Sequence, residues 1–205
     1  MLVSVLAFIG AATLLILVPG PDTAVVLRGT FAKGRRSGFR TTAGVMTGLT
    51  CWMLAATLGL SSLLRASQVG YDALRLAGGV YLIYLGSSTL WRTRTVSACE
   101  RGAGRSTPLG GYFAGLYTNL LNPKVGIFFL SFLPAFVPKG APVGAWTSLL
   151  GGIYVIEGGI WLSVVVRLAE AGAGWLYRAD LWRRLQQVTG VVLLGFGVRL
   201  LTERP

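Results

Sequence analysis

Long apolar runs, separated by short polar or basic segments, constrain this chain more than any other feature. A helix that crosses a bilayer needs about 20 mainly apolar residues. The chain is 53% hydrophobic and only 13% charged, whereas a soluble domain is closer to about 25% charged. We therefore predict an all-α membrane protein with six transmembrane helices. The expected spans lie at about 2–27, 41–64, 69–91, 110–134, 143–166 and 186–201.

The basic residues indicate how these spans are oriented. A net charge of +12 would suit a nucleic-acid binder, but the Lys and Arg residues cluster between the apolar runs. Segments 28–40, 92–109 and 167–185 together hold 13 of them, and the segments on the opposite side hold 5. Short loops rich in Lys and Arg stay in the cytoplasm. We expect no nucleic-acid partner, a cytoplasmic loop at 92–109 and both termini outside the cytoplasm.

Proline-containing breaks interrupt the first and fourth spans at matching places. Pro21 and Pro123 are 102 residues apart, and each half of the chain has three spans. A duplicated unit with an odd number of spans enters the membrane from opposite sides. We predict one transporter domain, residues 1–205, built from two inverted three-helix repeats. The first repeat covers about 1–91 and the second about 110–205.

Interrupted helices in matching positions of two halves indicate where a transporter binds its substrate. Proline removes an intrahelical donor, and backbone groups freed in this way need partners within the membrane. The alternative is a simple proline kink without a ligand. The candidate substrate-binding residues are Pro19, Gly20, Pro21, Asp22, Asn119, Asn122, Pro123 and Lys124.

Glu157 is the candidate proton-coupling residue. It lies within the fifth span, where an ionisable side chain costs about 2.5–3.5 kcal/mol and is normally paired or functional. The alternative is a structural pair with Lys124 that joins spans four and five. An amino-acid zwitterion needs one anion site and one cation site. Two groups suit its carboxylate: the N-terminal end of the half-helix that follows Pro21, and the side chain of Lys124. Asp22 and Glu157 suit its ammonium group.

Two further patterns leave alternatives open. Segments 44–48 and 111–115 each have a small residue at both ends of a five-residue stretch, a pattern of closely packed membrane helices. They would suit packing within one subunit or a homodimer. Apolar and Arg residues alternate over 175–185, which is typical of a helix in the headgroup region or of a loop.

At these motifs the chain resembles the lysine exporter family, in particular its homoserine/threonine-resistance (LysE/RhtB-type) amino-acid exporters. The matching blocks are Pro19–Asp22, Gly34–Gly38, Gly44–Gly48 and Asn119–Pro134, together with the acid Glu157 in the fifth span. The resemblance implies export of amino acids or related metabolites from the bacterial cytoplasm, across the inner membrane, driven by the proton gradient. We expect no cofactor.

Other function classes fit the sequence less well. The chain has no His, which removes the Ser–His chemistry of one class of intramembrane protease, and Asp72 supplies only half of an aspartyl-type site. We expect no enzyme and no metal site, because no complete catalytic set is present. An exporter of a metal cation would favour clustered Asp, Glu, His or Cys. A non-amino-acid metabolite remains a second substrate class, and the polar stripe or filter of a channel is not visible.

Overall fold

The computed structural model describes residues 2–66, 68–92, 111–138, 140–172 and 179–202. All regular structure in these ranges is helical, as predicted. The central loop 93–110 and residues 173–178 lie outside the described residues, and most of the segment 175–185 belongs to the last helix. The elements are α1 (Leu2–Leu17), α2 (Pro21–Lys33), α3 (Arg35–Ala66), α4 (Gln68–Arg92), α5 (Gly111–Leu120), α6 (Pro123–Ile127), a π-helical turn (Phe128–Phe132), a 3-10 turn (Leu133–Phe136), α7 (Val143–Glu170) and α8 (Ala179–Thr202).

Between two and four of the described segments meet the length and hydropathy of a membrane span. Residues 35–59 of α3 and the whole of α7 do so alone. The pair α1–α2 and the pair formed by α5 with the helices after Pro123 do so when each bent pair counts as one span. Helices α4 and α8 occupy the predicted third and sixth spans without meeting that test. The arrangement of six spans therefore stays a prediction.

Both predicted breaks are present. Each bent pair changes direction by 51°. Pro21 is the first residue of α2 and Pro123 the first residue of α6, a position where the missing N–H removes no helical hydrogen bond. Asn122 caps α6 by accepting a hydrogen bond from the backbone N–H of Lys124 at 3.1 Å.

On the basic side, the helices extend beyond the predicted spans one and two. Helix α2 runs on to Lys33 and α3 already begins at Arg35, because Lys and Arg are good helix formers and a helix can continue past the edge of the hydrocarbon. The chain reverses between the two helices at Gly34, whose φ of 77° favours glycine.

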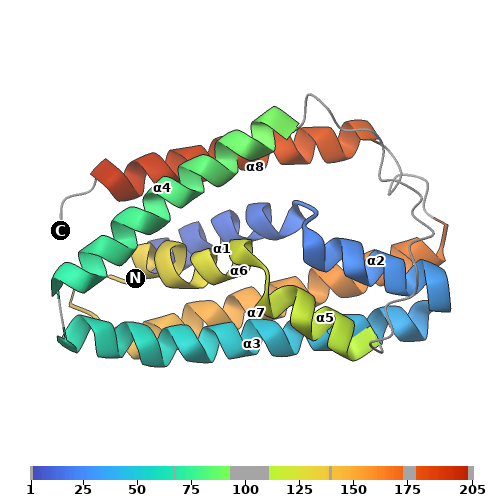
Figure 1. Ribbon diagram of the computed structural model, residues 1–205, viewed down its shortest axis with the longest axis horizontal. Coiled ribbons are helices and arrows are strands. Elements are labelled where there is room, and N and C mark those ends of the chain that lie inside the picture. The colour runs from blue at the N-terminus through green and yellow to red at the C-terminus, as the bar shows by residue number, and fades with distance from the viewer. Residues whose placement is uncertain (1, 67, 93–110, 139, 173–178, 203–205) are drawn as a thin grey trace.

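Helices α4 and α8 form a pair that lies beside the rest of the bundle (Figure 1). Their contact is made by glycines. A side chain on Gly86 would meet the carbonyl of Gly190 at 2.7 Å, and one on Gly197 would meet the carbonyl of Gly79 at 2.9 Å. The two helices are therefore antiparallel and approach closely, as small residues permit in membranes.

The predicted small-residue patterns pack α3 against α5 within the chain. A Cβ on Gly44 would overlap the carbonyl of Tyr112, and one on Gly115 would overlap the carbonyl of Thr41. Gly48 lies against the side chain of Asn119. Of the two alternatives, packing within one subunit accounts for these glycines.

Candidate functional site

The two helix breaks meet inside the molecule and are joined by side-chain hydrogen bonds. Oδ2 of Asp22, in the first turn of α2, accepts hydrogen bonds from the amide of Asn119 at 3.0 Å and from that of Asn122 at 3.2 Å. Asn119 is fully buried and Asn122 nearly so. The carboxylate of the first break is thus held by the two amides of the second.

Lys124 makes a second contact between the breaks, this time from the second break to the helix that precedes the first. Its Nζ donates a hydrogen bond to the carbonyl of Leu15 at 2.9 Å, in the last turn of α1. The last carbonyls of a helix lack intrahelical partners and carry partial negative charge that favours a cation. Each break therefore supplies the polar partner that the other lacks.

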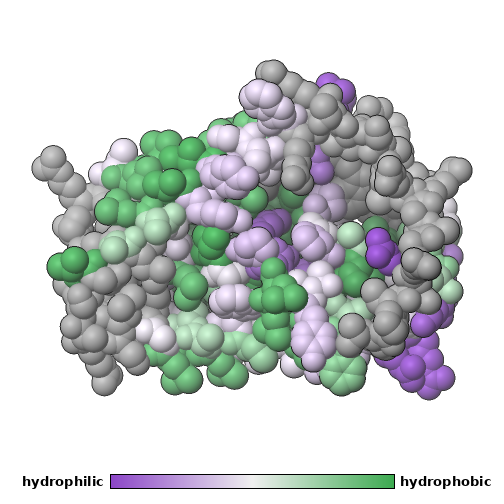
Figure 2. All heavy atoms as spheres, viewed as in Figure 1, coloured by the Kyte–Doolittle hydropathy of each residue, from purple (hydrophilic) through white to green (hydrophobic). Residues whose placement is uncertain are grey.

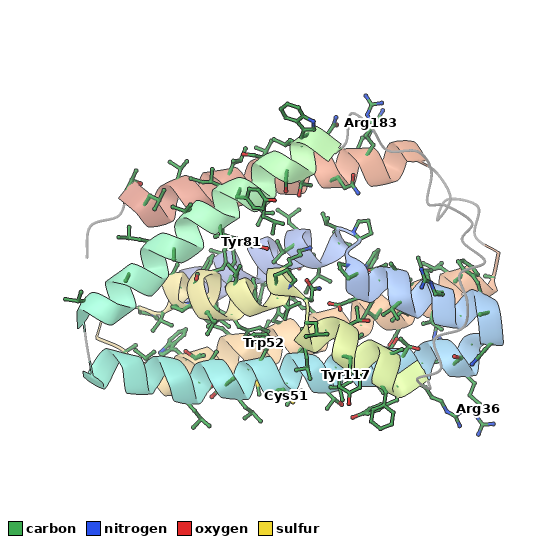
Figure 3. All side chains as sticks on the ribbon, in the orientation of Figure 1. Arg36, Cys51, Trp52, Tyr81, Tyr117 and Arg183 are labelled. Carbon is green, nitrogen blue, oxygen red and sulfur yellow. The ribbon has the colours of Figure 1, made fainter. Side chains whose placement is uncertain are left out.

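Helix α3 supports the second break. The indole nitrogen of Trp52 donates a hydrogen bond to the carbonyl of Asn119 at 3.4 Å, near the C-terminal end of α5. The ring of Trp52 also lies against Gly126 of α6, where an added Cβ would come within 2.8 Å of it. Trp52 therefore contacts the chain on both sides of the break, and Figure 3 shows it beside α6 at the centre of the molecule.

A cavity of about 50 Å³ lies between the two breaks. One water molecule needs about 10–15 Å³ of such space, so the cavity has room for a few waters in this conformation. Hydrophilic side chains gather in the middle of the face shown in Figure 2, between apolar ones. The cavity is lined by Leu15, Ile16, Val18, Gly20, Asp22, Thr23, Val45, Leu49, Asn122, Lys124, Val125, Tyr154, Gly158, Trp161 and Leu162.

The polar groups around this cavity are only partly satisfied. Oδ1 of Asp22, Oδ1 of Asn119 and the indole nitrogen of Trp161 are buried without a hydrogen-bond partner among the described residues. Asp22 and Lys124 both line the cavity, yet the ion pair within 4.0 Å in the described part of the chain is Arg35–Glu170. Opposite charges thus face one cavity without direct contact.

Glu157 lies apart from these groups. Its Oε2 accepts a hydrogen bond from Thr13 of α1 at 3.5 Å, and it does not line the cavity, whereas the next residue, Gly158, does. Lys124 is bonded to Leu15 instead. Within the described ranges, the alternative of a Glu157–Lys124 pair is therefore not the arrangement found.

The remaining candidates divide between two sides of the breaks. Gly20 caps α2 and lines the cavity, whereas Pro21 lines a groove on the outer side of the same turn. Pro19 precedes them in the break, and Pro123 is exposed at the start of α6.

Sequence reasoning missed the contribution of α7, which brings Tyr154, Trp161 and Leu162 to the cavity. Within a long apolar run, residues that line a cavity resemble those that face lipid. The one usable signal was the glycine pair 158–159, at which side chains of α3 approach α7 closely.

The chain is similar to several bacterial membrane proteins along nearly its whole length. It is 27% identical over 204 residues to an uncharacterised membrane protein of Bacillus subtilis, covering 96% of this chain and 97% of that protein. It is 33% identical over 193 residues to an uncharacterised membrane protein of Pseudomonas aeruginosa, covering 91% and 89%. It is 29% identical over 201 residues to the leucine efflux protein of Salmonella typhimurium, covering 95% and 93%.

No solved structure matches the chain. The model of the LysE type translocator family matches residues 13–204, which include both breaks and the cavity between them. A translocator is a transporter and not an enzyme, as the missing catalytic set predicted. The chain belongs to the LysE type translocator family.

Proposed function

We propose that this protein exports amino acids from the bacterial cytoplasm across the inner membrane, as one domain of six spans with both termini outside the cytoplasm. The observation that carries the proposal is the pair of reciprocal contacts between the breaks. Asp22 accepts from Asn119 and Asn122, and Lys124 donates to α1, around one cavity. In transporters with inverted repeats, the substrate binds between such broken helices.

The inverted repeat is supported by the symmetry of the helix contacts. Both breaks bend by 51°. Gly79 and Gly86 of α4 correspond to Gly190 and Gly197 of α8, since each pair is separated by 111 residues, and the contacts run from Gly79 to Gly197 and from Gly86 to Gly190. A two-fold rotation that exchanges the two halves therefore converts the contact between Gly79 and Gly197 into the contact between Gly190 and Gly86. The start of α1 and the end of α8 lie at the same end of the molecule (Figure 1), which suits an even number of spans.

A zwitterionic substrate fits the charges of the cavity. Its ammonium group would approach the unpartnered Oδ1 of Asp22, and its carboxylate would approach Lys124 and the first turn of α2, where the helix dipole favours an anion. Because Asp22 and Lys124 are not paired with each other, a zwitterion can contact both without displacing an ion pair.

The apolar lining favours an aliphatic side chain on the substrate. Leu15, Val45, Leu49 and Leu162 line the cavity, and several relatives are leucine efflux proteins. We propose leucine and similar neutral amino acids as substrates. The cavity of about 50 Å³ is too small for leucine in this conformation, so the breaks must separate during transport.

An export screen tests the substrate class. Cells that express the protein are loaded with dipeptides, and the free amino acids that appear outside are measured against cells that express Asp22→Asn. Export of leucine, isoleucine or valine by the wild type alone is expected. If no amino acid appears outside, the result contradicts amino-acid export and favours a non-amino-acid metabolite or a metal cation as the substrate.

Proton coupling is assigned to Glu157, because this intramembrane carboxylate lies on the helix that lines the cavity, one residue before Gly158. We expect Glu157→Gln to abolish leucine transport driven by a pH gradient in proteoliposomes while retaining leucine counterflow. Glu170→Gln is the matched control, since Glu170 lies at the end of the same helix. Transport driven by the pH gradient at the wild-type rate in Glu157→Gln would exclude Glu157 as the coupling group.

A homodimer remains a prediction with less support than before. The glycines that would have suited a dimer interface pack α3 against α5 within the chain. Chemical crosslinking in native membranes, followed by a mass measurement in detergent, decides between monomer and dimer.

A further inference from the structure

A groove of about 350 Å³ runs along the outer side of the first break, between α2 and α5. Most of its lining is apolar, with one charged side chain, that of Arg28. The lining residues are Pro21, Ala24, Val25, Arg28, Ala114, Tyr117, Thr118 and Leu121. This groove does not belong to the cavity between the breaks, because the first turn of α2 separates them. Gly20 and Asp22 line the cavity, and Pro21 lines the groove.

The position of Arg28 along α2 suits the level of lipid headgroups. Arg28 is seven residues beyond Pro21, which is about 10 Å along a helix at about 1.5 Å per residue. With the breaks near the bilayer centre, the edge of the hydrocarbon lies about 15 Å away. The long Arg side chain spans the remainder by extending its guanidinium towards the interface. Arg28 is exposed and makes no ion pair in the described part of the chain.

We propose that this groove binds an anionic phospholipid of the cytoplasmic leaflet. Its phosphate lies at Arg28, and one acyl chain lies against Ala24, Val25 and Leu121 towards the bilayer centre. The predicted orientation places the basic end of α2 in the cytoplasm, where an anionic leaflet attracts Lys and Arg. Charge complementarity thus comes from Arg28, and an acyl chain matches the apolar remainder of the groove.

A second copy of the chain suits the groove less well than a lipid. The protein has 19 Lys and Arg residues against 7 acids, so another copy brings mainly positive charge towards Arg28. Of its acids, Glu170 already pairs with Arg35 and Asp22 is bonded to Asn119 and Asn122. A lipid phosphate supplies the negative charge without that repulsion.

The test is native mass spectrometry of the purified protein with phosphatidylglycerol or phosphatidylcholine of identical acyl chains. We expect wild type to bind phosphatidylglycerol roughly fivefold more tightly, since one Arg near an anionic lipid contributes about 1 kcal/mol. Arg28→Gln should remove this preference. Arg36→Gln is the matched control for charge, because Arg36 is exposed outside the groove and projects away from the bundle (Figure 3).

A second variant tests the groove without changing charge. Ala114→Trp fills it from α5 and should weaken the binding of both lipids, while helicity and thermal midpoint report that the variant is folded. An equal loss of preference in Arg28→Gln and Arg36→Gln would overturn the proposal, as would full lipid binding by Ala114→Trp. Displacement of phosphatidylglycerol by equimolar inorganic phosphate would identify a free-anion site, and a dimer dissociated by Ala114→Trp would assign the groove to a second copy. Both results contradict the lipid proposal.

Discussion

Replacement of Asp22 separates a structural role of its carboxylate from a role in transport. Asp22→Leu removes the acceptor of two amide hydrogen bonds and leaves the Nδ2 groups of Asn119 and Asn122 buried without a partner. Each buried donor left unsatisfied costs about 1–3 kcal/mol, so the variant should lose roughly 2–6 kcal/mol of stability. Asp22→Asn keeps an acceptor oxygen at the same place. The exchange of two charge-assisted hydrogen bonds for neutral ones costs about 1 kcal/mol each, or roughly 2 kcal/mol together.

The assay is equilibrium unfolding in mixed detergent and dodecyl sulfate micelles, followed by tryptophan fluorescence and checked by circular dichroism. Glu170→Leu is the matched control. It replaces a half-exposed carboxylate that pairs with Arg35 at 3.4 Å, and an exposed pair contributes about 0–1 kcal/mol. We expect stability to fall in the order wild type, Asp22→Asn, Asp22→Leu, with the control near wild type.

Leucine counterflow measured on the same preparations completes the test. Asp22→Asn should remain folded and lose transport, because it retains the hydrogen bonds but not the charge proposed to hold the substrate's ammonium group. Equal stability of Asp22→Leu and Asp22→Asn would refute the hydrogen-bond reasoning. Wild-type counterflow by Asp22→Asn would refute the assignment of the ammonium site.

Two other predictions concern packing and orientation. Gly115→Ala should destabilise the protein by about 1–3 kcal/mol, because the new methyl would overlap the carbonyl of Thr41. The control Gly152→Ala, with no atom within 4 Å of its Cβ, should be neutral or gain up to about 1 kcal/mol; equal effects in the same unfolding assay would contradict the close approach of α3 and α5. In a Cys51→Ser background, Cys99 of the predicted cytoplasmic loop should react with an impermeant maleimide in inside-out vesicles and not in right-side-out vesicles. The opposite labelling would reverse the predicted orientation.

The sequence predicted where the helices break and which polar residues surround the breaks. Proline acts through local covalent geometry, so Pro21 and Pro123 identified both breaks without any knowledge of tertiary contacts. The partners of the polar groups depend on how segments about 100 residues apart come together. For that reason the bond from Lys124 to the carbonyl of Leu15 was not foreseen, and a pair with Glu157 was a reasonable alternative.

The apolar half of the site lay beyond sequence reasoning for a different reason. In a soluble protein, the buried face of a helix is apolar and the exposed face is polar. In a membrane protein, both the inner face and the lipid-facing face of a helix are apolar. Leu162 lines the cavity and Ile160 is exposed, yet both side chains are strongly apolar, so hydropathy does not indicate which of them faces the cavity. Only the packing of α7 against the other helices distinguishes them.

The reciprocal contacts also bear on how an exporter of this design avoids leakage. In the conformation described, Asp22 of the first break accepts hydrogen bonds from Asn119 and Asn122 of the second, and Lys124 of the second donates to the carbonyl of Leu15 at the end of α1. Separating the breaks without a substrate leaves these groups unpaired in a medium where each one costs several kcal/mol. A zwitterion compensates the two ionisable side chains at once, since its ammonium group can bind Asp22 and its carboxylate can bind Lys124. The neutral amides of Asn119 and Asn122 and the carbonyl of Leu15 then need water as a partner. On the proposed function, substrate binding therefore lowers the cost of opening, and a solute that carries only one of the two charges compensates only one side.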